Sequence, residues 1–182
     1  AVGARPDGTR RRIVLEQVET CRRLTERIRA LEREIADLVV RLAPGLLAIP
    51  GCSAVSAGHL IGQTGGVARF KGEAAFAMHV GVAPLPVSSG KSVRHRLNRT
   101  GNRKLNCVIH IIAVTQARMH PPAIEFMERK TSEGMSTREA LRCLKRHLAR
   151  AVYKMMLADE RASAAATSAP DLGAEEVATV AA

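Results

Sequence analysis

Residues 104–120 read KLNCVIHIIAVTQARMH, and the rest of the chain has to pack around this stretch. Its apolar residues recur at intervals of three and four, which is the spacing of one face of an α-helix. The face consists of Leu105, Val108, Ile109, Ile112 and Thr115, and it is widened by Ile111 and Val114. So wide an apolar face predicts the most buried helix of the protein, beginning near Gly101 or Asn102.

The composition predicts that helices also surround this stretch. The chain has 182 residues, enough for one modest domain with appendages, and only 2% of them are aromatic. The Phe and Tyr residues are Phe70, Phe76, Phe126 and Tyr153, and Trp is absent. Such a core relies on aliphatic side chains and alanine, which favours a mostly α fold over a β-sandwich.

Upstream, residues 46–62 read LLAIPGCSAVSAGHLIG and resemble a helix-hairpin-helix. In that element a glycine turn lets backbone N–H groups at a helix start approach a DNA phosphate. Gly51 provides the turn here, and Ser53 stands where a second glycine is usual and caps the next helix with its hydroxyl. An ordinary αα-corner is the alternative for these residues.

Three more helices are expected on either side of the central one. The first runs over residues 70–80, with Phe76, Ala77 and Val80 in the core and His79 at its edge. Pro121-Pro122 precedes the second, at residues 123–130, and Gly134 ends it. Ser136 and Glu139 form a capping box that starts the third, from Thr137 to about Ala158.

The helix expected at residues 137–158 has two distinct faces. Its core face consists of Leu141, Leu144, Leu148, Val152 and Met155. Its other side carries Arg142, Lys145, Arg146 and Arg150. We interpret this basic side as a solvated face, and contact with a nucleic-acid backbone is the alternative.

The N-terminal part of the chain has the heptad pattern of a coiled coil. The a positions are Val14, Cys21, Ile28, Ile35 and Leu42, and the d positions are Gln17, Leu24, Leu31 and Leu38. In a parallel dimer Arg27 at g faces Glu32 at the partner's next e position. The pattern predicts self-association, and packing of the helix on its own domain is the alternative.

These segments divide the chain into four parts. Residues 1–10 are a disordered start, 11–43 a coiled-coil helix that ends at Pro44-Gly45, and 44–158 a compact helical domain. Residues 159–182 are Ala/Ser-rich and acidic, and we expect a disordered tail. The fold predicted is thus mostly α, with a long coiled-coil helix followed by a helical domain that contains the helix-hairpin-helix-like element and a basic loop.

Cysteine spacing and hydropathy predict a cytoplasmic protein. Cys21, Cys52, Cys107 and Cys143 lie far apart, without the pairs of close cysteines that bind zinc or form a tight disulfide framework. We expect them to be reduced and buried. The sequence shows neither an apolar run long enough to span a membrane nor a signal peptide, and it starts without Met, as a fragment or an artificial start would.

The positive charge is large and local. The net charge is +11 and the pI about 10.5, which predicts an anionic partner. Nucleic acid is the partner we expect; a membrane surface and solubility alone are weaker readings. Residues 85–120 carry seven Lys and Arg and no Asp or Glu, and turn residues at 86–90 indicate a loop. Arginine prevails over lysine there, and its guanidinium grips two phosphate oxygens at once.

Three segments in this order resemble a known family. They read IPGCSAVSAGHL, ARFKGEAAFAMHVGVAP and SSGKSVRHRLNRTGNRKL. Together they resemble the C-terminal transposase domain of the insertion sequence one-hundred-and-ten family, over residues 45–157. The resemblance implies a site-specific DNA recombinase that works with a guide RNA, the bridge RNA. In that family a coiled coil links the domain to an N-terminal RuvC-like nuclease domain.

The resemblance implies that Ser89 is the catalytic serine, because the family's serine-glycine pair falls on Ser89-Gly90. A serine that attacks a phosphodiester needs cations aimed at the charge that develops on phosphorus. The nucleic-acid contacts we expect are Gly51, Ser53, Lys91, Arg94, Arg96, Arg99, Gly101, Asn102, Arg103 and Lys104, with the backbone N–H groups of Gly101 and Asn102 holding a phosphate.

The sequence departs from the family pattern in several places. His79 stands where a Tyr is common, Ser53 replaces a glycine, and Asn98 and Asn106 lie where basic residues are frequent. The four carboxylates of the RuvC-like site are absent, so no cofactor is expected in this chain, and a divalent metal would belong to the missing domain.

We therefore expect this chain alone to be unable to recombine DNA. Its partners would be DNA, the guide RNA and a second copy of the chain, and no membrane. Two alternatives remain, a non-catalytic dimeric nucleic-acid-binding protein and a decayed transposase remnant.

Overall fold

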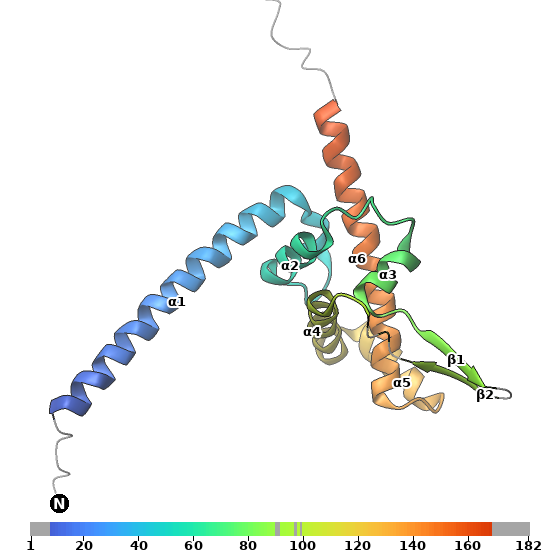
Figure 1. Cartoon of the computed structure of the whole chain (residues 1–182), viewed down its shortest axis with the longest axis horizontal. Helices are drawn as coiled ribbons and strands as arrows, with labels where there is room; N and C mark the ends of the chain where they lie inside the picture. The colour runs from blue at the N-terminus through green and yellow to red at the C-terminus, as the bar shows by residue number, and fades with distance from the viewer. Residues whose placement is uncertain (1–7, 90–91, 97, 99, 169–182) are drawn as a thin grey trace, which may run out of the picture.

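The computed structural model describes residues 8–89, 92–96, 98 and 100–168, and in this part the protein is mostly α-helical, as predicted (Figure 1). The elements in chain order are α1 (Gly8–Leu42), the 3-10 helix η1 (Pro44–Ala48), α2 (Ala54–Thr64), α3 (Glu73–Val80), β1 (Leu85–Ser89), β2 (Ser92–Arg96), α4 (Arg103–Met119), α5 (Pro121–Ser132) and α6 (Thr137–Ser168). None of the described helices is both long and apolar enough to cross a membrane.

Helix α1 extends away from the compact part of the molecule (Figure 1). Apart from the intermediate Thr20 and Ala30, every residue from Gly8 to Glu34 is exposed. Only the last turns contact the domain, where Val39 is 1% exposed and lies in the core. The alternative that this helix packs on its own domain therefore holds for its C-terminal end alone.

Helix α4 is the centre of the core, as its sequence predicts. Leu105, Ile109, Ile112 and Ala113 are fully buried, and α4 packs against α2, α5 and α6. Each such aliphatic side chain contributes about 1.5–3 kcal/mol when it leaves water. The predicted widening at Ile111 is wrong, because this residue lies on the solvent side and is 52% exposed.

Helix α3 has the predicted core residues, since Phe76, Ala77 and Val80 are fully buried. His79 is half-buried, as expected for the core edge, with its ring centroid 5.1 Å from that of Phe70.

Helix α6 begins with the predicted capping box and continues further than predicted. The Ser136 amide donates to Glu139 Oε2 over 3.0 Å, and the Glu139 amide donates back to Ser136 Oγ over 3.4 Å. The buried face consists of Leu144, Leu148, Val152 and Met156. Met155, predicted to be in the core, is 40% exposed, because steps of four residues from Leu144 lead to residue 156.

The first part of the predicted tail is helical and structurally important. Asp159 and Glu160 lie in α6, where Asp159 Oδ2 accepts the Gly45 amide over 3.0 Å. Glu160 accepts the amides of Val67 and Ala68 over 2.5 and 3.0 Å. Disorder from residue 159 is therefore wrong up to Ser168, because these carboxylates satisfy backbone donors of two distant loops. Residues 169–182 lie outside the described residues.

The segment expected to be a basic loop contains a β-hairpin. Strands β1 and β2 pair antiparallel, with Leu85 opposite Arg96 and Ser89 opposite Ser92. Valine at positions 87 and 93 suits a strand, because β-branched residues are enriched in strands. The prediction of a loop is therefore wrong for residues 85–89 and 92–96, which are paired strands, and residues 90–91 lie outside the described residues.

All four cysteines are free, as expected, but only Cys52 is buried. Burial raises the pKa of the Cys52 thiol to about 11, so it stays protonated and acts as a small apolar side chain. Cys21 and Cys107 are exposed, which corrects the expectation that the cysteines are buried.

We predict that Glu160→Ala lowers the free energy of unfolding by about 2 kcal/mol, because two backbone N–H groups lose a charged acceptor. Glu125→Ala, at an exposed position of α5, is the control and should leave stability nearly unchanged. Urea unfolding of both variants measures the difference. Equal stabilities of the two variants would contradict the role assigned to Glu160.

Candidate nucleic-acid interface

Three asparagines at four-residue spacing hold the base of the hairpin, and we call Asn98, Asn102 and Asn106 the asparagine clasp. A helix leaves its last four carbonyl groups without partners inside the helix. The clasp supplies donors to the carbonyl groups of residues 78–81, at the end of α3. The bonds are 3.0 Å from Asn98 Nδ2 to Met78, 2.7 Å from the Asn102 amide to His79, and 3.1 and 3.0 Å from Asn106 Nδ2 to Val80 and Gly81.

Two glycines cross inside the asparagine clasp. Gly81 ends α3 with a φ of +77°, a left-handed conformation that side chains disfavour. A Cβ on Gly101 would lie 2.3 Å from the Gly81 Cα atom, so the two backbones touch directly. The chain enters the hairpin just after Gly81 and returns just before Gly101. Both ends of the hairpin are therefore fixed at one point.

Lys145 of α6 reaches the same place from the opposite side. Its ammonium donates to Asn106 Oδ1 over 2.7 Å, and the residue is 9% exposed. Burial is the main cause that lowers the pKa of Lys145; Cys107 opposes this effect and Arg142 adds to it. The interpretation of the basic side of α6 as a solvated face is therefore wrong for Lys145, although Arg142 is exposed.

A hollow of about 310 Å³ lies at the base of the hairpin, and we call it the base hollow. Among the described residues it is lined by Asn98, Gly101, Arg103 and Asn106. Arg103 and Lys104 open α4 and are exposed, so both side chains are accessible to a ligand, as their predicted role requires. The hollow thus joins the asparagine clasp to the start of the central helix.

The structure gives Gly101 and Asn102 roles other than those expected. The Asn102 amide donates to His79, so the prediction that this N–H holds a phosphate is wrong. Asn102 Oδ1 caps α4 by accepting the amides of Lys104 and Leu105 over 2.9 and 3.1 Å. Gly101 provides the space for the backbone crossing.

Ser89 lies at the last described position of β1, opposite Ser92. Because a strand alternates with a period of two, positions 89, 92, 94 and 96 belong to one face of the hairpin. Position 88 belongs to the other face, with 93 and 95. The register therefore groups Ser89 with the positions of Arg94 and Arg96, and it separates Ser88 from them. Lys91 and Arg99 lie outside the described residues.

The helix-hairpin-helix-like turn lies elsewhere. Ser53 caps α2 as predicted, and its hydroxyl accepts the Ser56 amide over 3.2 Å. Gly51 has a φ of +79°, and a Cβ there would lie 3.0 Å from the Thr115 side chain. Residues 103 and 115 of α4 are about 18 Å apart at 1.5 Å per residue. The structure therefore does not bring Gly51 and Ser53 together with Arg103 and Lys104.

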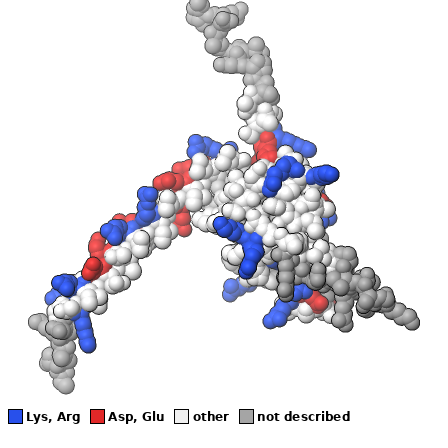
Figure 2. Space-filling view, in the orientation of Figure 1, with Lys and Arg blue, Asp and Glu red and all other residues white. Residues whose placement is uncertain are grey.

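The charges of the described surface are arranged differently on α1 and on the compact part of the molecule. On the face shown in Figure 2, Lys and Arg alternate with Asp and Glu along α1. On the compact part, basic side chains are separated by uncharged surface in this view. Arg150 is also neutralised, since its Nε lies 3.0 Å from Glu73 Oε1. In the sequence, six of the seven Lys and Arg of residues 85–120 fall between Lys91 and Lys104, in the hairpin segment and the first turn of α4, with no Asp or Glu among them.

The asparagine clasp and Lys145 were not found as a site from the sequence. Asn98 and Asn106 were read as losses of positive charge, but in the structure they replace charge with helix-capping donors. The repeat of asparagine at positions 98, 102 and 106 was the available signal. Lys145 offered none, because its burial depends on the packing of α6 against α4.

Comparison with known proteins shows that the chain is similar in sequence to transposases and other proteins of insertion elements. Residues 43–128 match the model of the transposase IS116/IS110/IS902 family. This segment includes the turn at Gly51, the hairpin, the asparagine clasp and α4.

Three curated proteins are similar to the chain. The insertion element IS110 uncharacterized 43.6 kDa protein of Streptomyces coelicolor is 29% identical over 134 residues, which cover 72% of this chain and 33% of that protein. The insertion element IS116 uncharacterized 44.8 kDa protein of Streptomyces clavuligerus is 28% identical, with coverages of 73% and 34%. The insertion element IS900 uncharacterized 42 kDa protein of Mycobacterium paratuberculosis is 27% identical, with coverages of 74% and 36%. The chain thus spans about a third of the length of the curated relatives it matches.

We predict opposite effects for two glycine-to-alanine substitutions. Gly101→Ala should lower the free energy of unfolding by about 3 kcal/mol, because its Cβ would overlap the Gly81 backbone. Gly62→Ala, in an exposed turn of α2 with open space around it, should raise it by about 0.5–1 kcal/mol. Thermal unfolding compares the two. A Gly101→Ala variant as stable as the wild type would contradict the backbone crossing.

Proposed function

We propose that this chain is the DNA-binding, serine-bearing C-terminal portion of an insertion-sequence transposase, with Ser89 as nucleophile. The observation that carries the proposal is the hairpin of residues 85–96, fixed at its base and rich in arginine, inside the segment that matches a transposase family. The register supports Ser89 over Ser88, because it groups position 89 with positions 94 and 96.

The chemistry is the transfer of a phosphodiester to serine. The Ser89 hydroxyl loses its proton, its oxygen bonds to phosphorus, and the bond from phosphorus to one sugar oxygen breaks. That oxygen leaves with the bonding electrons and takes up a proton, and the other DNA end stays joined to the protein. Arginines on the same strand pair would stabilise the charge that develops on phosphorus.

The full reaction requires parts that lie beyond this domain. The resemblance implies an N-terminal RuvC-like domain, which would contribute a divalent metal, and a guide RNA that selects the DNA. The relatives are about three times as long as the matched segment, which leaves room for such a domain. We place the reaction in the cytoplasm, where bacterial DNA lies, and expect the chain alone not to complete recombination.

We predict that Ser89→Ala abolishes covalent protein–DNA adducts. The chain is mixed with guide RNA, DNA and the N-terminal domain of a full-length relative, and adducts are separated on a denaturing gel. Ser88→Ala is the matched control and should keep the adduct, because position 88 lies on the other face of the hairpin. Undiminished adduct formation by Ser89→Ala would remove the nucleophile assignment.

A non-catalytic nucleic-acid binder is the second candidate, favoured by the unbalanced charge of residues 85–120 alone. It predicts equal binding of DNA by the wild type and Ser89→Ala, with the same salt dependence, and no covalent adduct under any of these conditions. An adduct that depends on Ser89 excludes it.

Self-association through α1 belongs to the proposed function. The exposed a and d positions include Leu24, Ile28 and Leu31, at 54%, 55% and 40% exposure. Bare apolar side chains along about three heptads favour burial against a second copy of the same helix.

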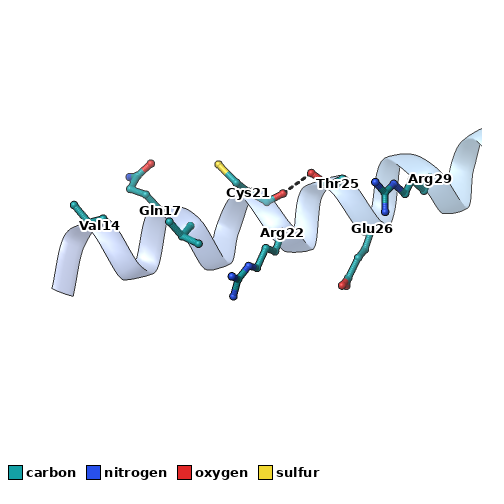
Figure 3. Close-up of a pocket in the computed structure, with 8 residues that line it drawn as sticks. Val14, Gln17, Cys21, Arg22, Thr25, Glu26 and Arg29 are labelled. Carbon is teal, nitrogen blue, oxygen red and sulfur yellow. Dashed lines mark hydrogen bonds between the residues drawn. The ribbon is translucent and has the colours of Figure 1, made fainter. Parts of the chain in front are cut away.

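A groove along α1, of about 490 Å³, follows part of this seam (Figure 3). Gln17 and Cys21 point to one side of the helix, and Arg22 and Glu26 point to the other (Figure 3). The Thr25 hydroxyl, at an e position beside the seam, donates to the Cys21 carbonyl over 2.8 Å. The seam side of α1 therefore suits burial, and the opposite side suits solvent.

We predict that Leu24→Glu shifts the protein from dimer to monomer in analytical ultracentrifugation, because it places two carboxylates against each other in the seam. Leu15→Glu is the control, since Leu15 is equally exposed, at 58%, but occupies a b position outside the seam. It should leave the dimer intact. A wild-type chain that sediments as a monomer at micromolar concentration would contradict self-association.

A further inference from the structure

We propose that the base hollow binds one phosphate group of a nucleic-acid strand, with positive charge supplied by Arg103 at its wall and by Lys145 behind Asn106. The assignment of the phosphate to a strand rests on the proposed function, whereas the anion site itself does not. The site would hold a phosphate that is not cleaved, and so fix the strand relative to the hairpin.

The size and lining of the hollow suit this ligand. A volume of about 310 Å³ corresponds to about ten water molecules at roughly 30 Å³ each, which accommodates a phosphate group with part of its hydration. Two of the described lining residues are asparagines and one is an arginine. The Arg103 guanidinium is a donor that phosphate oxygens accept from, whereas the side-chain N–H groups of Asn106 already donate to Val80 and Gly81, and Asn98 Nδ2 donates to Met78. No acidic side chain lines it among the described residues.

Lys145 provides the second observation. Buried charges in proteins are almost always paired, yet neither ion pair of the described part of the chain involves Lys145. Its ammonium has three donors, and Asn106 Oδ1 takes one of them. A positive charge therefore lies beneath the hollow without a carboxylate to balance it. An anion in the hollow would supply the missing charge.

Asn106 connects this charge to the hollow. Its oxygen faces the Lys145 ammonium at 2.7 Å, and the residue also lines the hollow. Because Lys145 is buried, water and salt screen its field less than the field of an exposed lysine. The groups around it have opposing effects, since Arg142 lowers the pKa of Lys145 and Cys107 raises it.

The start of α4 is not the source of attraction. The amides of Lys104 and Leu105 already donate to Asn102 Oδ1. The attraction for the phosphate therefore comes from the side-chain charges of Arg103 on α4 and Lys145 on α6. Such a contact positions a strand without reading its sequence.

The test compares Lys145→Met with Lys154→Met. Each variant removes one lysine from α6, but Lys154 is exposed whereas Lys145 is buried. Lys145→Met leaves Asn106 Oδ1 without its donor but also removes a buried charge that lacks a carboxylate, and because these two effects have opposite signs the variant should remain folded. Urea unfolding verifies this, and Arg103→Met provides a second variant at an exposed wall position.

Binding of a fluorescent single-stranded oligonucleotide is measured at low and high salt. Lys145→Met should bind about tenfold more weakly at both, because the buried charge is poorly screened. Lys154→Met should bind at most about twofold to threefold more weakly at low salt and like the wild type at high salt. The proposed phosphate site would be wrong if Lys145→Met and Lys154→Met bound the oligonucleotide equally. It would also be wrong if both Lys145→Met and Arg103→Met bound it like the wild type.

Inorganic phosphate distinguishes the sources of the ligand. If it competes with the oligonucleotide in the wild type but not in Lys145→Met, the site takes a phosphate of the strand. If phosphate binding requires Lys145 while Lys145→Met binds the oligonucleotide like the wild type, the assignment of the ligand to a strand is wrong. The adduct assay reports on Ser89 and the binding assay on Lys145, so loss of the adduct and loss of the anion site are separate results.

Discussion

The carbonyl groups of residues 78–81, at the end of α3, are four acceptors that need hydrogen-bond donors, and this requirement organises the base of the hairpin. The asparagine clasp satisfies all four, and in doing so it draws the residues after β2 against the end of the helix before β1. The crossing of Gly81 and Gly101 is possible only because neither residue has a side chain. The hairpin therefore starts and ends at one fixed point on the helical core.

Helix α6 links this point to the rest of the molecule. Near its N-terminal end Lys145 holds Asn106, and further along Asp159 and Glu160 hold the loops that begin at Gly45 and Val67. Gly45 directly follows the turn that ends α1, so one helix is bonded to both the hairpin base and the entrance of the long arm. The relative placement of these two parts depends on α6 remaining intact.

Sequence reasoning succeeded where a local pattern determines the structure. The apolar period of α4, the core residues of α3, the Ser53 cap and the capping box at Ser136 are all contained within a few residues, and all are confirmed. It failed where partners are distant. Asp159 and Glu160 were assigned to a disordered tail, because the amides that they bind lie more than 90 residues away.

The candidate site shows the same limit. The family resemblance led to the segment that the transposase model matches, but the roles of Asn102 and Asn106 depend on contacts with α3 and α6. Met155 and Met156 are adjacent in a long helix, and because both are methionine, residue type does not decide which of them is buried. The serines and the glycine of residues 86–90 are turn formers and predict a loop, whereas residues 85–89 and 92–96 pair as strands.

The hairpin consists of two strands only, and in the described part of the chain it packs extensively on no other element. A lone pair of strands is marginally stable in water, so these two strands depend on the part of the molecule that holds their base. The two strands are therefore held to the helical part of the molecule through the asparagine clasp at their base.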